Sequence, residues 1–266
     1  MRIDVEQRNH VRVYGQGERA MVFSHGFGCD QAMWRYVAPA FADRYRVVFF
    51  DHVGAGHSDL RAYDAAKYST LDGYAGDVVE ICEELGLRGC VFVGHSVSAM
   101  IGVLAAKRAP GLFSRMVMVG PSPSYINDGD YVGGFARADI EELLTFLDSN
   151  YLGWSGAMGP VIMGRADHPE FGEELTNSFC RTDPEIARQF GRVTFLSDCR
   201  GDLEGMRVPS LLLQCSDDVV APLAVGEYLH ARLEGSTLVV LRATGHCPHL
   251  SAPDEVIGAM EAYLAV

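Results

Sequence analysis

The sequence predicts an α/β protein in which a mostly parallel sheet is covered by helices on both faces. Two observations support this prediction: short apolar runs recur along the chain, and helical or turn-rich segments separate them. The runs lie at residues 20–23, 47–50, 90–93, 116–119, 211–214 and 238–241. Size is a third observation, since 266 residues, 48% of them hydrophobic, can bury a full core within one α/β domain.

A helix is predicted between the second and the third run. Apolar residues recur there at spacings that place them on one helical face. They are Leu71, Tyr74, Ala75, Val78, Cys82 and Leu85. The alternation of strand and helix therefore extends through the first half of the chain.

Residues 91–106, V-F-V-G-H-S-V-S-A-M-I-G-V-L-A-A, place a serine between a strand and a helix. The apolar run meets Ser96 and passes directly into a helical segment of small residues, a pattern typical of the sharp turn that exposes a nucleophilic serine above a parallel sheet. Ser98 stands where this turn usually has a second glycine that lets the helix approach the strand. Because serine adds only a hydroxymethyl group, we expect the turn to form and Ser96 to be the nucleophile.

A nucleophile of this kind needs amide donors that stabilise an oxyanion, and an earlier turn can supply one. The motif Ser24 to Gly28 follows the first apolar run and contains Phe27 between two glycines. These glycines allow the Phe27 N–H to turn toward a substrate oxygen. The second N–H would come from Val97, directly after the nucleophile. A purely structural turn is the alternative.

The acid and the base should follow Ser96 in the order Asp, His, each just beyond a late strand. One late apolar run ends at Asp217 and Asp218, and the next is followed by His246. An imidazole can accept the proton of a serine hydroxyl, and a carboxylate fixes the imidazole tautomer. Two choices stay open on the residues alone. Asp217 competes with Asp218, and His249 competes with His246, although we expect His249 to hydrogen-bond locally at the edge of the next helix.

The alternation breaks at residues 121–203, where no strand-like run appears and helix starts recur. Each start has an aspartate near acidic residues or a proline, and the three aspartates are Asp139, Asp167 and Asp183. We therefore predict a helical cap at residues 121–203, inserted into a core formed by residues 1–120 and 204–266.

The composition excludes several classes of function. A net charge of −13 without a Lys and Arg cluster argues against nucleic acid or an anionic membrane as a partner. The longest apolar stretch, residues 97–106, is too short to span a bilayer. Seven scattered cysteines without a C-x-x-C pair indicate neither a disulfide framework nor a zinc site. We expect no metal, no cofactor and a cytoplasmic location.

The motifs together resemble the α/β-hydrolase fold and, within it, the RsbQ-like bacterial stress-response hydrolases, which are related to the plant strigolactone and karrikin receptors. The similarity runs through nearly the whole chain. The motifs are S-H-G-F-G-C-D-Q (24–31), D-H-V-G-A-G-H-S-D-L (51–60), V-G-H-S-V (93–97), M-V-G-P-S-P (118–123), L-Q-C-S-D-D (213–218) and G-H-C-P-H (245–249).

The resemblance implies a role for each matched residue. It assigns Ser96 as nucleophile, Asp218 as acid and His246 as base, with the amides of Phe27 and Val97 as the oxyanion hole. It also implies a closed apolar pocket above Ser96, lined by Phe27, Tyr125, Phe135, Trp154, Met158 and Phe195. Such a pocket favours a small apolar ester or lactone.

Two classes of function follow from this resemblance. The first is a signalling serine hydrolase in a stress response, whose partner would be a PAS-domain phosphatase. The second is a metabolic esterase or lactonase that forms an acyl-enzyme and has no signalling partner. A carbon–carbon bond hydrolase or a cofactor-free haloperoxidase could share the same triad.

Overall fold

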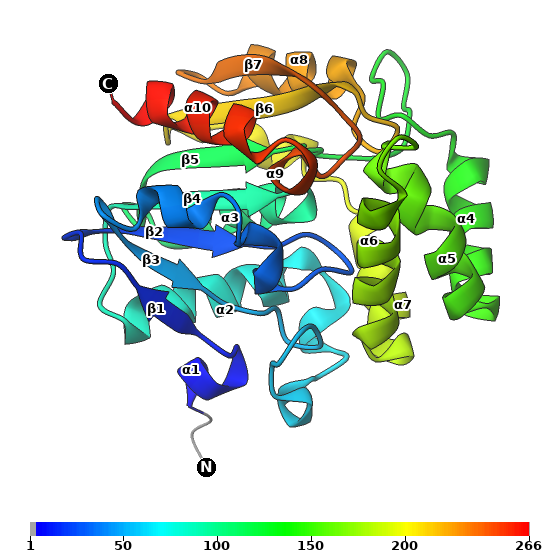
Figure 1. The fold of residues 1–266 in the computed structure, drawn as a ribbon, viewed down its shortest axis with the longest axis horizontal. Helices are drawn as coiled ribbons and strands as arrows, with labels where there is room; N and C mark the ends of the chain where they lie inside the picture. Colours follow the sequence, from blue (N-terminus) through cyan, green and yellow to red (C-terminus); the bar gives the residue numbers. More distant parts are fainter. Residues whose placement is uncertain (1–3, 266) are drawn as a thin grey trace.

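Residues 4–265, which the computed structural model describes, form one seven-stranded sheet in the order β1-β3-β2-β4-β5-β6-β7 (Figure 1). The first three residues and the last residue of the predicted core lie outside this range. The strands are β1 (Arg12–Tyr14), β2 (Arg19–Ser24), β3 (Tyr45–Phe49), β4 (Cys90–His95), β5 (Phe113–Val119), β6 (Ser210–Asp217) and β7 (Thr237–Thr244). Only β1 pairs antiparallel, with β3 at the edge of the described sheet. The predicted α/β class is confirmed.

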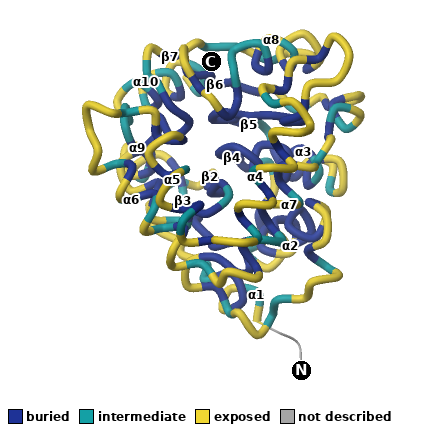
Figure 2. Tube along the Cα trace, turned by 90° about the vertical axis from the view of Figure 1, so that its right-hand side faces the viewer, coloured by how far each residue is buried: buried dark blue, intermediate teal, exposed yellow. Residues whose placement is uncertain are grey.

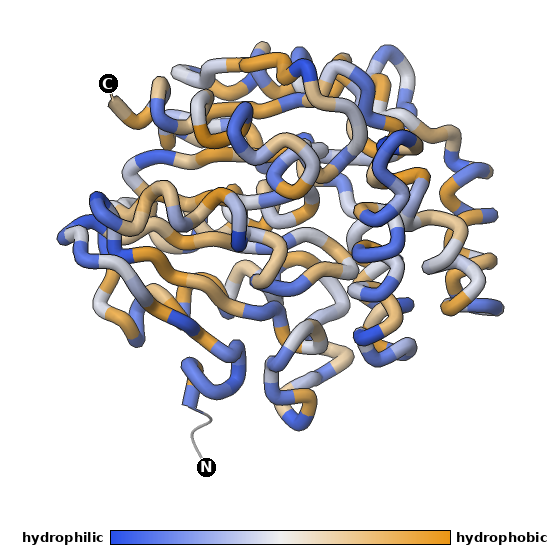
Figure 3. Tube along the Cα trace, in the orientation of Figure 1, coloured by the Kyte–Doolittle hydropathy of each residue, from blue (hydrophilic) through white to orange (hydrophobic). Residues whose placement is uncertain are grey.

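Alternate side chains of the strands enter two separate cores. Val22 and Phe92 face one core, which is covered by α2 (Leu71–Glu84), α3 (Val97–Arg108) and α8 (Leu223–Arg232). Met21, Phe23 and Val93 face the other core, which is covered by α10 (Pro253–Leu264) and the short α9 (Pro248–Ser251). Because both faces are covered, the central strands are apolar along nearly their whole length (Figure 3). A further short helix, α1 (Val5–Arg8), precedes β1.

Four helices lie between β5 and β6, in a stretch that is described throughout. They are α4 (Arg137–Ser149), α5 (Tyr151–Met163), α6 (Pro169–Arg181) and α7 (Pro184–Phe195). Figure 1 shows them stacked beyond the carboxyl ends of the parallel strands. Their buried residues Leu147, Trp154 and Phe179 belong to the same core as Met21 and Phe23, so these helices pack directly on the sheet domain.

The helix starts differ in detail from the predicted aspartates. Asp183 is the N-cap of α7, and its carboxylate accepts from two amides. Asp139 is instead the third residue of α4, where its carboxylate accepts from the Ala136 amide at 3.0 Å. The N-cap of α6 is His168, one residue after Asp167. A fourth start, at Asn150 before α5, was not predicted, although the Asn150 side chain caps the helix by accepting from the Gly153 amide.

Viewed from the side of the cap helices, the buried strands lie at the centre of the molecule with exposed segments around them (Figure 2). Within residues 4–265, no helix combines the length and the apolar character needed to cross a membrane. The carboxyl ends of β4, β6 and β7 point toward the cap, which is where ligands bind in parallel α/β sheets.

Candidate active site

Ser96 lies on a strained turn between β4 and α3. Its φ is +56° and its ψ is −126°, a backbone conformation that non-glycine residues rarely adopt. Two glycines make room for this turn. A Cβ at Gly94 would lie 2.7 Å from the Ser98 carbonyl oxygen, and one at Gly26 would lie 2.5 Å from the ring of His95. The turn therefore forms although residue 98 is a serine, as the sequence predicts.

The ends of three strands bring a serine, an imidazole and a carboxylate into contact. His246 Nε2 is 2.7 Å from Ser96 Oγ, and His246 Nδ1 is 2.7 Å from Asp218 Oδ2. The other Asp218 oxygen accepts from the amides of Val220 at 2.8 Å and Ala221 at 3.1 Å. Since the carboxylate can only accept, Nδ1 carries the proton and Nε2 is free to accept from the serine hydroxyl.

The two alternatives from the sequence occupy different environments. Asp217 is exposed at the end of β6, where its backbone carbonyl accepts from Gly245 at 2.7 Å, and its carboxylate has no hydrogen-bond partner among the described residues. His249 is fully buried beside Trp34, with ring centroids 4.6 Å apart. The expectation that His249 hydrogen-bonds locally is wrong, because neither ring nitrogen has a partner among the described residues. Burial lowers the pKa of His249 to about 3, which keeps this imidazole neutral.

The two predicted amide donors are free to bind a ligand. Among the described residues, neither the Phe27 N–H nor the Val97 N–H donates to a protein acceptor. Val97 is the first residue of α3, so its amide belongs to the positive end of a helix. Gly28 has a φ of +72°, and a Cβ there would overlap the Phe179 ring at 1.7 Å. The turn that carries Phe27 therefore requires glycine at this position.

Three hydrogen bonds join Ser98, on α3, to the end of β2, to the turn that follows β2 and to the loop that follows β3. The Ser98 hydroxyl donates to the His25 carbonyl at 2.5 Å and accepts from Ser24 Oγ at 2.9 Å. His52 Nε2 lies 2.9 Å from the same oxygen. Because the Ser98 proton is already committed, this nitrogen must donate, and burial holds the pKa of His52 well below its usual range. The sequence predicts that a serine is tolerated at position 98. It does not predict the hydrogen bonds that the Ser98 hydroxyl makes.

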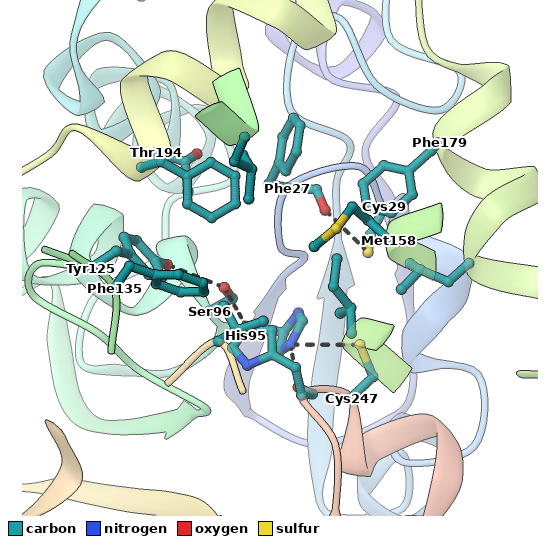
Figure 4. Close-up of a pocket in the computed structure, with 16 residues that line it drawn as sticks. Phe27, Cys29, His95, Ser96, Tyr125, Phe135, Met158, Phe179, Thr194 and Cys247 are labelled. Carbon is teal, nitrogen blue, oxygen red and sulfur yellow. Dashed lines mark hydrogen bonds between the residues drawn. The ribbon is translucent and has the colours of Figure 1, made fainter. Parts of the chain in front are cut away.

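A small, mostly apolar cavity lies above Ser96, between the sheet and the cap helices (Figure 4). Its free volume is about 30 Å³. Tyr125 reaches into it, with its hydroxyl 3.4 Å from Ser96 Oγ, and burial raises the Tyr125 pKa. The cavity in this state has room for no more than a small ligand group.

Most predicted pocket residues line this cavity. They are Phe27, Tyr125, Phe135, Met158 and Phe195. Trp154 does not, because it packs behind the lining, with its ring centroid 6.0 Å from Phe27 and 5.0 Å from Phe179. Other lining residues were not predicted to face the pocket, because most of them are not aromatic and the one aromatic residue, Phe179, belongs to the hydrophobic core. They are Cys29, Leu143, Ile162, Leu175, Phe179, Thr194, Val220 and Cys247.

Within residues 4–265, two groups of side chains have donor atoms close enough to hold a metal ion, within 4.8 Å of one another. One consists of His95, Cys247 and His249, and burial raises the Cys247 pKa, which disfavours the thiolate that binds metals. The other consists of His10, Asp51 and His57, where each Asp51 oxygen already accepts from an amide at 2.9 Å. His95 belongs to the first group and also lines the cavity above Ser96.

A serine, an imidazole and a carboxylate, held in this chain order at the carboxyl edge of a parallel sheet under a helical cap, define a hydrolase of the α/β class. The sequence pattern of the α/β hydrolase family matches residues 21–259, and the chain belongs to this family. The predicted resemblance to the α/β-hydrolase fold is thus confirmed.

Relatives narrow this assignment. The chain is 41% identical to karrikin insensitive 2 receptor CA of Petunia hybrida, over 95% of this chain and 94% of the relative. It is 42% identical to strigolactone esterase D14 of Arabidopsis thaliana, over 93% and 92%. A solved hydrolase from Oleispira antarctica superimposes with a TM-score of 0.96 at 40% identity, covering 98% of this chain and 96% of the other. The predicted relation to strigolactone and karrikin receptors is confirmed.

Proposed function

We propose that the protein hydrolyses a small ester or lactone through an acyl-enzyme on Ser96. One observation carries the proposal: His246 lies between Ser96 and Asp218 at 2.7 Å from each. In the first step Ser96 Oγ attacks the substrate carbonyl carbon and its proton passes to His246 Nε2. The bond to the alkoxy oxygen then breaks, and His246 returns the proton to that oxygen. Water, deprotonated by His246, releases the acid and frees Ser96.

The amides of Phe27 and Val97 would stabilise the oxyanion of both steps. Their freedom from protein acceptors supports this role, as does the position of Val97 at a helix N-terminus. Asp218 would hold the tautomer of His246 and stabilise its protonated form. The set needs no metal, because donors and base are all protein groups.

The pocket supports a small and mostly apolar acyl group. Phe27, Phe135 and Phe195 line it together with aliphatic side chains, and the burial of Ser96 limits its contact with bulk water until a ligand enters. A free volume of about 30 Å³ means that larger substrates require movement of the cap side chains. The relative named strigolactone esterase supports ester cleavage as the reaction class.

The direct test is Ser96→Ala, assayed with a short-chain aryl ester. We expect turnover to fall by about 10⁴-fold or more, because the members of a triad act as one unit. Thermal unfolding of the variant should resemble that of the parent chain, which shows that the loss is chemical. Ser149→Ala, which changes an exposed serine on α4, is the matched control. Retention of a tenth of the parent activity would remove Ser96 from this role.

A second candidate function is RsbQ-like signalling in a stress response, with a PAS-domain phosphatase reading the state of the cap. Exposed apolar side chains on α5 favour it. This helix has no charged residue, and Leu152 and Val161, on opposite sides of it, are 65% and 50% exposed. Large apolar side chains are exposed at surfaces that meet a partner. A metabolic hydrolase does not need them.

A further inference from the structure

Thr194 places an unpaired hydroxyl at the pocket. The residue lies in the last turn of α7, is 1% exposed, and belongs to the pocket lining. Its Oγ1 is buried and has no hydrogen-bond partner among the described residues. Figure 4 shows Thr194 on the cap side of the pocket, across from Ser96 and His95.

This hydroxyl is unusual among the helical hydroxyls of the cap. Serine and threonine inside a helix can donate to the carbonyl four residues earlier. Thr145 does so to Glu141 at 2.7 Å, and Ser155 does so to Tyr151 at 2.8 Å. Thr194 makes no such bond. A buried hydroxyl without a partner destabilises the protein, so its presence at a ligand cavity requires an explanation.

The other polar groups of the lining are already engaged. Tyr125 faces Ser96, His246 bridges Ser96 and Asp218, and His95 Nε2 lies 2.9 Å from the His246 carbonyl. The remaining nitrogen of His95 is covered by Gly26, where even a Cβ would lie 2.5 Å away. Thr194 is therefore the lining hydroxyl that a ligand can use without disturbing the proposed reaction.

We propose that Thr194 binds a second oxygen function of the substrate, remote from the ester or lactone carbonyl that Ser96 attacks. The substrate class is then a small, otherwise apolar ester or lactone that also carries a ketone, hydroxyl or ether oxygen. The Thr194 hydroxyl donates to that oxygen, and the ligand supplies the partner that the protein lacks. This inference rests on the proposed hydrolysis at Ser96 and adds the selectivity of the pocket.

The test compares Thr194→Val, which keeps the side-chain shape, with the parent protein. The probes are 4-nitrophenyl esters in matched pairs, each with a ketone at carbon 3, 4 or 5 of the acyl chain or a methyl branch at the same carbon. For each pair, the kcat/KM of the ketone ester is divided by the kcat/KM of the methyl-branched ester. Comparing this ratio between the two proteins cancels differences in the intrinsic reactivity of the esters. At one of the three positions we expect the parent protein to prefer the ketone ester over the methyl-branched ester. This preference should fall roughly tenfold in Thr194→Val. Unchanged ratios at all three positions overturn the inference.

Thermal unfolding without ligand provides an independent readout. Thr194→Val should raise the Tm, because it removes an unpaired hydroxyl. The matched control is Thr176→Val, since Thr176 on α6 donates to the Ser155 carbonyl at 3.2 Å, and its Tm should fall. A fall for Thr194→Val as well would show that its hydroxyl is paired within the protein, which also overturns the inference. Loss of turnover in Ser96→Ala separately tests the hydrolysis itself.

Discussion

Beneath Ser96, polar side chains are joined by a network of hydrogen bonds. Above Ser96, the pocket is mostly apolar, and the hydroxyl of Thr194 has no hydrogen-bond partner among the described residues. On the lower side, Ser98 makes three hydrogen bonds and Asp218 accepts three. On the upper side, the apolar residues Phe135 and Phe195 line the cavity, and no group within residues 4–265 is hydrogen-bonded to the Thr194 hydroxyl. The difference suggests that the sheet domain sets the reaction, and that the cap selects the ligand.

The largest expected effect comes from the acid in the lower region. Asp218→Asn should reduce turnover by roughly 10⁴-fold, because an amide no longer holds His246 in the tautomer that accepts the Ser96 proton. Asp217→Asn is the matched control next to it, and should keep most of the activity since its side chain is exposed. Steady-state kinetics of both variants show which aspartate is the acid. If the ranking is reversed, Asp217 is the acid; if the losses are equal, the pair cannot be separated in this way.

A smaller effect is expected from Ser98. Ser98→Ala removes the bond to the His25 carbonyl, which loosens the turn that carries the Phe27 amide, so kcat should fall roughly tenfold with KM little changed. Unfolding should also become easier, by about 1–3 kcal/mol.

Two further variants separate a positioning role of Ser98 from simple destabilisation. Ser98→Thr keeps the hydroxyl and should recover kcat. Ser210→Ala is the matched control, because Ser210 is fully buried at the start of β6 and donates to the Val208 carbonyl at 2.9 Å. It should lower stability without lowering kcat. A kcat for Ser98→Ala equal to that of the parent would refute the positioning role.

The smallest effect on turnover should come from the exposed side chains of α5. Leu152→Glu and Val161→Glu each change one of them, so ester hydrolysis should stay within about twofold of the parent rate. If a partner binds to α5, at least one of the two variants should nevertheless lose stress-pathway output in cells. Val240→Glu, on β7 and 47% exposed, is the matched control. Cellular output that always follows the rate of hydrolysis would favour a metabolic hydrolase over a signalling one.

The sheet was predictable because buried parallel strands leave continuous apolar runs in the sequence. All six runs lie in β2 to β7, apart from Phe50, which follows β3. The β1 strand was missed because its three residues are all exposed and carry no such signal. The order of Ser96, Asp218 and His246 was visible as well, since each lies within two residues of the end of a strand. Which aspartate bonds to His246 depends on burial, and the residues alone left that open.

Side-chain direction accounts for what the sequence could not predict in the pocket. Helical spacing places Trp154 among the apolar residues of the cap, but it does not say whether the ring faces the cavity or a neighbouring helix. Likewise, the sequence does not say whether Thr194 donates to its own helix, or whether His249 finds a partner. Ser98 was noticed as a departure from glycine, yet its bonding required knowledge of where Ser24 and His52 lie.

Phe27 connects the sheet domain below Ser96 with the cap above it. Through this connection, binding of a ligand and binding of a partner can affect each other. The Phe27 amide is the proposed oxyanion donor, whereas its ring lies 5.6 to 6.1 Å from the ring centroids of four cap aromatics, Trp154, Phe179, Phe190 and Phe195. A shift of the cap helices would therefore move the proposed oxyanion donor. By linkage, if a partner and the ligand both bind one arrangement of the cap more tightly, each raises the affinity of the other by the same factor.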